Sequence, residues 1–385
     1  MFRMPGCMIA ITLGYLVAAP GSAHAQGTAR SLDLDPSVRA AGMGAASNAV
    51  FWDGGNQWSN PALLGYERGI RYEWSETQLV PDLAAGVYFH SNVVKLGGGG
   101  AAVSLSGRPG IGGLKLDYGL SEGSDETGNP TGTFGSFEEI ESWGFGISLG
   151  QLTESIARLS NRRLPALSRY GDVSVGMYSK EALVQLGPNF AFTSRGRDLG
   201  VLARVSPLEW FATTRDGLVD FDLAYGWSDL SYDGETDRFL LASDPPSEHK
   251  RRGGAARIGV AWPEQARGVF GRHQWLADGM SPLVSVGMAM DHDEISPGAF
   301  YETDGRGVEI GLANVFAFRT GSYEDLDGEI DGSTQGWSIG LPVGRLAGLR
   351  YDRAEIPQAT GLSKVDREAF SLWVDPLEIW SVLNR

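Results

Sequence analysis

Short segments in which large apolar residues alternate with small or polar ones recur through most of the chain. Successive side chains of a β-strand point to opposite faces of the sheet, so this two-residue period predicts strands rather than helices. About thirteen such segments can be counted by this period. The clearest lie at residues 143–150, 219–227, 257–262, 284–291 and 308–319, and weaker ones lie at 83–89, 101–105, 173–177, 199–205, 337–341 and 370–374.

The residues between the large apolar ones indicate the class of β-structure. In residues 143–150 they are glycine and serine, and in residues 219–227 they are aspartate, alanine and glycine. A soluble β-sandwich or solenoid, which is the alternative, usually exposes longer polar side chains. An outer-membrane barrel turns large apolar residues to lipid and small or polar ones inward, and single-chain barrels have even strand counts. We therefore predict an all-β, transmembrane antiparallel β-barrel of about 14 strands.

The chain before the first strand differs in composition from the rest. Residues 1–25 contain an early arginine, an apolar stretch and a small-residue end, which are typical of a cleaved signal peptide. Residues 26–66 follow neither the helix nor the strand period, and residues 39–64 are rich in glycine and alanine with few charges. We predict that residues 26–66 form a hatch or plug segment for a barrel of residues 67–385. A flexible leader is the alternative.

Composition argues against several classes of function. A net charge of −15 without a long basic cluster argues against a nucleic-acid partner. The single cysteine, Cys7, lies in the predicted signal peptide, so disulfides, thiolate catalysis and cysteine-ligated metals are not expected. The acidic runs 291–294 and 325–331 lack the spacing of metal ligands and predict solvated loops. Without a serine elbow or a phosphate loop, we predict neither an enzyme nor a cofactor.

Charged residues also occur on the predicted inner face of several strands. Asp220 and Asp222 share that face with Arg204, Arg257 and Arg319. Buried charges in a membrane protein pair with one another or line water. The five residues therefore predict an ion-pair network that fills the barrel, or a polar path through its lumen, and the first interpretation is favoured.

Several connections between strands suggest contacts outside the barrel. The acidic stretches 121–136, 231–248 and 323–333 predict long outer loops, so a structural or adhesin-like barrel that binds partners through them is an alternative function. Residues 151–170 predict either a short amphipathic helix at the membrane interface or an ordinary loop.

Both ends of the chain resemble a known group of barrels. The run at residues 39–46, followed by the Asn-Pro-Ala of residues 60–62, resembles the start of the PorV/PorQ-type outer-membrane proteins. These belong to the wider superfamily of FadL long-chain fatty-acid transporters. Residues 307–321, 336–341 and 349–354 resemble the last strands of PorV-like proteins. The usual Asp-Tyr pair of the last of these strands is reversed here, as Tyr351-Asp352.

The resemblance implies an N-terminal hatch inside a 14-stranded barrel of the cell outer membrane, acting in transport or secretion. FadL-like members take up hydrophobic molecules through the barrel wall, whereas PorV-like members handle cargo in type IX secretion. The implied partners are outer-membrane lipid and lipopolysaccharide, with hydrophobic small molecules or secreted protein cargo. We expect the hatch to line a ligand pocket. The candidate residues are Gly42, Met43, Gly44, Phe51, Trp52, Trp58, Asn60, Pro61 and Ala62.

Overall fold

The computed structural model describes residues 29–383, apart from 85, 108–110, 125–126, 128, 160–166, 188–189, 212–217, 232–246, 274, 297–300 and 326–329. The predicted signal peptide lies outside the described residues. Within them, no helix is long and apolar enough to cross a membrane.

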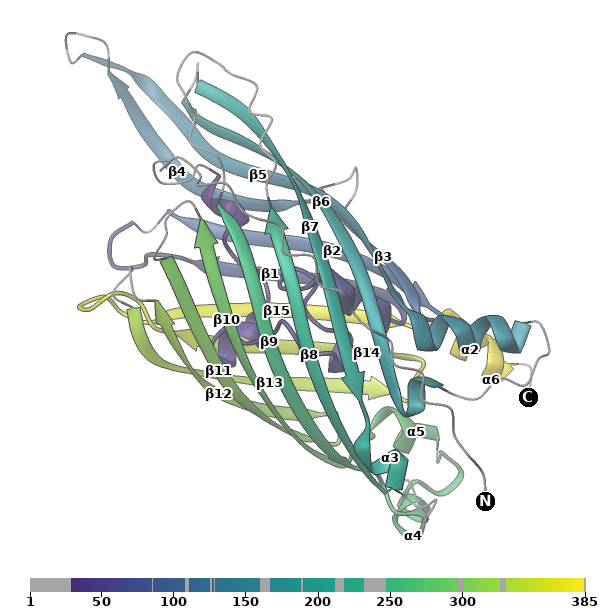
Figure 1. Cartoon of the computed structure of the whole chain (residues 1–385). Helices are drawn as coiled ribbons and strands as arrows, with labels where there is room; N and C mark the ends of the chain where they lie inside the picture. Colours follow the sequence, from purple (N-terminus) through teal and green to yellow (C-terminus); the bar gives the residue numbers. More distant parts are fainter. Residues whose placement is uncertain are drawn as a thin grey trace.

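Fifteen strands form one closed antiparallel sheet (Figure 1). β1 pairs with both β2 and β15, which closes the barrel. β3 and β4 each pair with β2 and with β5, so these two strands share one position and the wall has the 14 positions that the sequence predicted. The strands are β1 (Gly69–Gln78), β2 (Tyr88–Gly98), β3 (Ala101–Ser106), β4 (Leu114–Ser124), β5 (Pro130–Ser148), β6 (Gly171–Gly187), β7 (Phe190–Val205), β8 (Val219–Ser231), β9 (Glu248–Val260), β10 (Val284–Ser296), β11 (Tyr301–Leu312), β12 (Phe316–Asp325), β13 (Ile330–Val343), β14 (Ala347–Ile356) and β15 (Val365–Val374).

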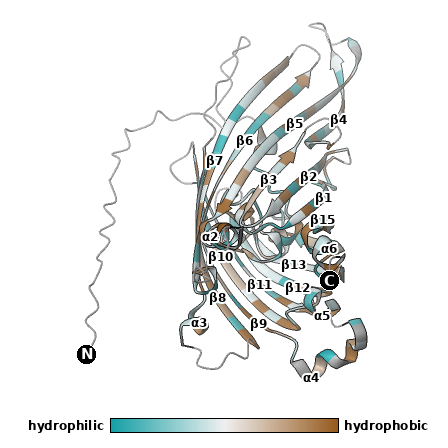
Figure 2. Ribbon diagram, turned by 90° about the vertical axis from the view of Figure 1, so that its right-hand side faces the viewer, coloured by the Kyte–Doolittle hydropathy of each residue, from teal (hydrophilic) through white to brown (hydrophobic). Residues whose placement is uncertain are grey.

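Burial alternates along the strands as the sequence pattern predicts. In β13, for example, Trp337, Ile339 and Leu341 are exposed, and the residues between them are buried. The outward side chains are thus large and apolar. Figure 2 shows bands of apolar and polar residues along the strands. A face of this kind is suited to the hydrocarbon core of a bilayer.

The two ends of the barrel differ. We call the end where β1 begins and β15 ends the terminal end, and the opposite one the distal end. Most helical turns of the connections lie at the terminal end, at the right and lower right of Figure 1. They are α2 (Leu149–Leu159), η4 (Leu167–Arg169), α3 (Pro207–Phe211), α4 (Glu264–Arg267), η5 (Gly268–His273) and α5 (Trp275–Gly279), and α6 (Pro376–Leu383) follows β15. The described residues of the acidic stretches 121–136 and 323–333 lie mostly in the distal ends of β4, β5, β12 and β13, although they were predicted as loops. Most of the third stretch lies outside the described residues.

Residues 29–68, which we call the N-terminal segment, lie inside the barrel (Figure 1). The segment contains η1 (Arg30–Leu32), α1 (Val38–Gly42), η2 (Trp52–Gly54) and η3 (Pro61–Tyr66). Its apolar side chains form the core with small or aliphatic residues of the wall. Met43, Val50 and Leu63, for example, are buried with Leu202 and Ala255. The core of this protein therefore lies between the segment and the inner face of the sheet.

Candidate functional site

The N-terminal segment packs directly on the backbone of the wall at glycine positions. A Cβ atom built on Gly176 would lie 2.3 Å from the carbonyl carbon of Pro61, and one on Gly307 would lie 2.4 Å from the carbonyl oxygen of Met43. Neither distance leaves room for a side chain. The wall glycines in close contact with the segment, which we call the glycine belt, are Gly97, Gly146, Gly176, Gly200, Gly226, Gly253, Gly287, Gly305, Gly307, Gly321 and Gly336. The small inner-face residues are thus the surface on which the segment rests.

Glycine residues and the Asn-Pro-Ala motif also determine the conformation of the segment and its attachment to the wall. Gly44 has a φ of +66°, and its Cβ would lie 2.2 Å from a carbonyl oxygen of β12, so both its conformation and its surroundings require glycine. Gly42 lies against the belt in a similar way. Asn60 caps η3, because its Oδ1 accepts a hydrogen bond from the amide of Ala62 (3.0 Å). Its Nδ2 donates to carbonyls of the segment and of β7 (3.0 and 3.1 Å), which ties this turn to the wall.

A balanced network of charges joins the segment to β11, β12 and β14. We call this network the latch, and its members are Arg39 and Asp53 of the segment and Glu309, Arg319, Arg350 and Asp352 of the wall. At its centre, Glu309 accepts hydrogen bonds from Arg39 (2.9 and 2.6 Å), from Arg319 (2.6 Å) and from the indole of Trp52 (2.8 Å). Three arginines thus face three carboxylates, and the pair at the centre, Glu309 and Arg319, is almost completely buried.

Arg350 completes the latch on the side of the terminal end. It binds Asp352 of the same strand (2.9 Å) and Asp53 of the segment (2.8 Å). Burial alone would raise the pKa of Asp53, but the guanidinium groups of Arg350 and Arg39 outweigh this effect and hold the pKa below its usual range. Asp53 is therefore charged at neutral pH, and its attraction to the two arginines helps to hold the segment in place.

The five charged residues that were predicted on the inner face do not form a single network in the structure. Arg204 and Asp222 form an ion pair (3.5 Å), and Arg319 belongs to the latch. Asp220, Asp222 and Arg257 line a polar cavity of about 620 Å³ at the terminal end, which we call the terminal cavity. Some of these charges are therefore paired and others border open space. A path through the lumen stays a prediction.

A second cavity, of about 540 Å³, lies at the distal end between the start of the segment and strands β9 to β15. We call it the distal cavity. Its apolar lining consists of Leu34, Leu79, Ile295, Tyr323, Ile330, Ile356, Leu362 and Val365, with several alanines. Binding sites for small molecules have this size and are mostly apolar with a few polar groups. None of these residues was a candidate in the sequence.

The polar side of the distal cavity is built from ion pairs between the wall and the segment. His249 lies between Asp293 (2.8 Å) and Asp33 of the segment (3.2 Å), and Arg251 also binds Asp293 (2.8 Å). Asp291 accepts hydrogen bonds from two backbone amides of the segment (2.6 and 2.7 Å). The segment therefore forms part of the cavity and is held there by charged residues of β9 and β10.

The interpretation of residues 291–294 as a solvated loop was wrong. β10 continues to Ser296, so Asp291 and Asp293 lie on its inner face. An acidic strand end is stable there because the segment amides, His249 and Arg251 compensate the two carboxylates. These partners are far away in the sequence, which is why the local pattern did not indicate them.

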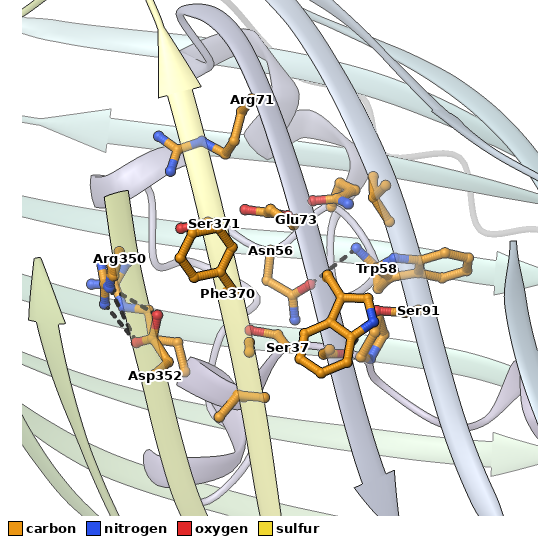
Figure 3. Close-up of a pocket in the computed structure, with 18 of the residues that line it drawn as sticks. Ser37, Asn56, Trp58, Arg71, Glu73, Ser91, Arg350, Asp352, Phe370 and Ser371 are labelled. Atoms are coloured by element: carbon orange, nitrogen blue, oxygen red, sulfur yellow. Dashed lines mark hydrogen bonds and ion pairs between the residues drawn. The ribbon is translucent and has the colours of Figure 1, made fainter. Parts of the chain in front are cut away.

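Figure 3 shows a third cavity, of about 80 Å³, between the segment and strands β1, β2, β14 and β15. Polar side chains such as Ser37, Asn56, Glu73 and Ser91 surround it, and the latch lies at one edge. The volume suits a few water molecules but not an apolar ligand.

The four large apolar candidates of the segment do not share one cavity. Met43, Phe51 and Trp52 belong to one buried cluster and Trp58 to another. Phe51 and Trp52 also border the terminal cavity, and Trp58 borders the small polar one. Contact with a ligand stays a prediction for these residues. In the structure they hold the segment to the wall.

The strand position between β2 and β5 is interrupted where β3 ends and β4 begins, although hydrogen bonds still join this place to β2. The amide of Asn92 donates to the carbonyl of Gly113 (3.2 Å), and the carbonyl of Asn92 accepts from the hydroxyl of Ser106 (2.7 Å). β2 pairs with β3 over residues 94–98 and with β4 over residues 88–90, so residues 91–93 lie between the two ladders. The chain leaves the sheet through Gly107 and Gly112, which have φ values of +74° and +67° and are joined by a 2.6 Å hydrogen bond. This interruption explains why 15 strands occupy 14 positions.

Apolar side chains connect the distal cavity with the inner side of this interruption. Phe89 and Val93 of β2, Leu114 of β4 and Ile140 of β5 form a buried cluster with Trp58. Leu34 and Leu79, which line the distal cavity, pack against the same cluster. A buried apolar cluster therefore reaches from the distal cavity to the inner side of the interruption. The buried Lys180–Asp198 ion pair lies beside it, with the ammonium group of Lys180 over the ring of Trp58 (4.3 Å).

Comparison with known proteins gives similarity in structure but not in sequence. No protein-family model and no curated protein matches the chain. The Ralstonia pickettii toluene transporter TbuX matches with 11% identity over 89% of this chain and 98% of that one, at a TM-score of 0.44. The CymD monoaromatic hydrocarbon channel matches with 10% identity over 87% and 95%, at 0.43. A FadL homologue from Pseudomonas aeruginosa matches with 9% identity over 88% and 98%, at 0.38.

Proposed function

We propose that this protein is an outer-membrane channel for the uptake of small apolar compounds. A closed barrel with an apolar exterior satisfies its backbone inside a bilayer and covers its outward side chains with lipid. An even number of wall positions places both chain ends on one side of the membrane. We assign the terminal end to the periplasm and the distal end to the outside, because the chain is expected to be exported by its signal peptide.

The observation on which this proposal rests is the apolar lining that joins the distal cavity to the interruption between β3 and β4. A small apolar molecule would enter the distal cavity, where Leu34 and Leu79 offer it a surface away from water. It would then move along the cluster of Phe89, Val93 and Ile140 toward the wall. The molecule would leave the barrel at the interruption and enter the membrane there, so it would not have to pass through the closely packed N-terminal segment.

The same geometry favours small molecules over protein cargo. A cavity of about 540 Å³ holds a small ligand but not a folded protein segment of any length. The N-terminal segment occupies the lumen between the distal and terminal cavities and is held there by the glycine belt and the latch. We therefore propose the hydrophobic-uptake function rather than the handling of secreted proteins.

Uptake of radiolabelled toluene by bacteria that express the full chain tests the proposal. The variant Leu34→Asp places a carboxylate in the apolar lining, and its matched control, Leu34→Met, keeps the side chain apolar and similar in size. Desolvation of a carboxylate costs several kcal/mol, so we expect uptake to fall at least about tenfold in the first variant and to change little in the second. Equal uptake by both variants, at equal amounts of folded barrel, would contradict the proposal.

A further inference from the structure

Two helices at the terminal end present apolar side chains away from the barrel. In α2, Leu149 and Ile156 are 50% and 55% exposed and lie two turns apart on one face of the helix. In α6, Leu377 and Trp380 are 70% and 69% exposed and lie one turn apart. Exposure of this extent is unusual for large apolar residues in water, and the two helices have it at the same end of the molecule.

The two helices flank the same turn of the wall. In the turn between β2 and β3, a Cβ atom built on Gly99 would lie 3.2 Å from Ser155 of α2, and one on Gly98 would lie 3.6 Å from Leu377 of α6. Figure 1 shows both helices beside the strand ends at the terminal end. Ile70 of β1 and Leu96 of β2 are paired at this end and are exposed on the outer face. The apolar faces of the helices thus continue the apolar exterior of the barrel.

We infer that α2 and α6 lie in the interface of the membrane leaflet at the terminal end, with their apolar faces in the boundary between phospholipid headgroups and acyl chains. The inference rests on the proposed membrane-spanning barrel and adds a binding surface outside it. Interfacial helices bury one apolar face in this boundary, and tryptophan is enriched at the same depth. On the opposite side of α2, Glu154 accepts hydrogen bonds from the amide and hydroxyl of Ser168 (3.0 and 2.6 Å), so its polar face is directed toward protein.

The charges of these helices define the kind of membrane contact. α2 contains one glutamate and one arginine, and α6 contains one glutamate and no basic residue. Attraction to anionic lipid requires a basic polar face, which both helices lack. Apolar area therefore provides the binding, and the partner is phospholipid in general rather than an anionic lipid.

Fluorescence quenching by brominated lipid tests the position of the helices. The only cysteine of the chain is Cys7, so single cysteines can be introduced in a Cys7→Ser background and labelled with an environment-sensitive nitrobenzoxadiazole dye. The test positions are Ile156→Cys and Leu377→Cys. Glu378→Cys is the matched control on α6, because Glu378 borders the terminal cavity. Leu199→Cys, on the exposed outer face of β7, reports on the barrel itself.

The labelled proteins are reconstituted in phosphatidylcholine vesicles that carry bromine at shallow or deep acyl positions. We expect shallow bromine to reduce the emission at positions 156 and 377 at least about twofold more than at position 378, with no change when anionic lipid is added. Quenching at position 199 without quenching at 156 and 377 would overturn the inference about the helices alone. Absence of quenching at position 199 would overturn the membrane-spanning barrel and this inference with it. Quenching at 156 and 377 that requires anionic lipid would contradict the neutral, apolar contact.

Discussion

Replacement of Glu309 by glutamine removes the carboxylate that Arg39 and Arg319 share in the latch. In the native protein this carboxylate accepts three hydrogen bonds from the two guanidinium groups, at 2.6 to 2.9 Å. The side chains of Glu309 and Arg319 are almost completely buried, and that of Arg39 is largely so. Water therefore cannot replace the lost charge, and the two arginines face each other across a neutral amide.

The expected loss follows from the number of partners that remain. Removal of one member of a buried ion pair costs about 3–5 kcal/mol, because the other charge stays buried without compensation. Arg319 retains Asp352 (3.0 Å), and Arg39 retains a longer contact with Asp53 (3.7 Å). We therefore expect the lower part of this range, a decrease of about 3 kcal/mol in the free energy of unfolding.

Urea unfolding of the refolded protein in lipid vesicles measures this decrease. The matched control is Glu302→Gln, which removes the same charge from an exposed position of the same strand. A surface change of this kind should alter the free energy of unfolding by no more than about 0.5 kcal/mol. A Glu309→Gln variant as stable as the control would refute the assignment of the latch as a stabilising connection between the segment and the wall.

Three further predictions concern the segment. Gly307→Ala should prevent close packing of the segment and lower the urea midpoint clearly, whereas Gly254→Ala, whose new methyl group has free space on the same sheet, should leave the midpoint nearly unchanged. Asn60→Ala removes a helix cap and two further hydrogen bonds, so thermal unfolding should show a loss of about 1–2 kcal/mol, and a loss below about 0.3 kcal/mol would contradict the role of this residue. Because the pKa of Asp53 is lowered in the folded protein, its stabilising effect is present above the unfolded pKa of about 4 and is lost as the pH falls through the lower folded value. The stability difference between wild type and Asp53→Asn should thus be constant from pH 8 to 5 and shrink at lower pH, and a difference that grows on acidification would contradict this.

The barrel could be predicted from the sequence because the pattern that indicates each strand, an alternation of apolar and small residues, lies within a few consecutive residues. Large apolar residues such as Trp337 and Ile339 alternate with small ones, and this alternation recurs in most strands of the barrel, whose outer face is apolar. The interruption between β3 and β4 was not predictable, since Gly107 and Gly112 have the same appearance as the glycines of an ordinary hairpin. Its presence depends on pairing of both short strands with β2 and β5.

The site depends on contacts between distant parts of the chain. Arg39 and Glu309 are separated by 270 positions, and no local pattern connects them. The inner-face glycines predicted a small-residue interior, but the reason for each glycine, such as Met43 against Gly307, follows only from the path of the segment. Leu34 lines the distal cavity but precedes the glycine-rich run of residues 39–64 from which the ligand-binding candidates were predicted.

Planar-bilayer conductance of the full chain and of a variant that lacks residues 29–64 tests the central claim most directly. The claim is that the N-terminal segment fills the lumen and leaves only small cavities around it, so that apolar compounds travel along one side. We expect no large conductance from the full chain and large, stable conductance steps from the deletion variant, with folding of both confirmed by resistance of the barrel to protease. Equal, large conductance from the two proteins would show that the segment does not close the barrel and would contradict the account.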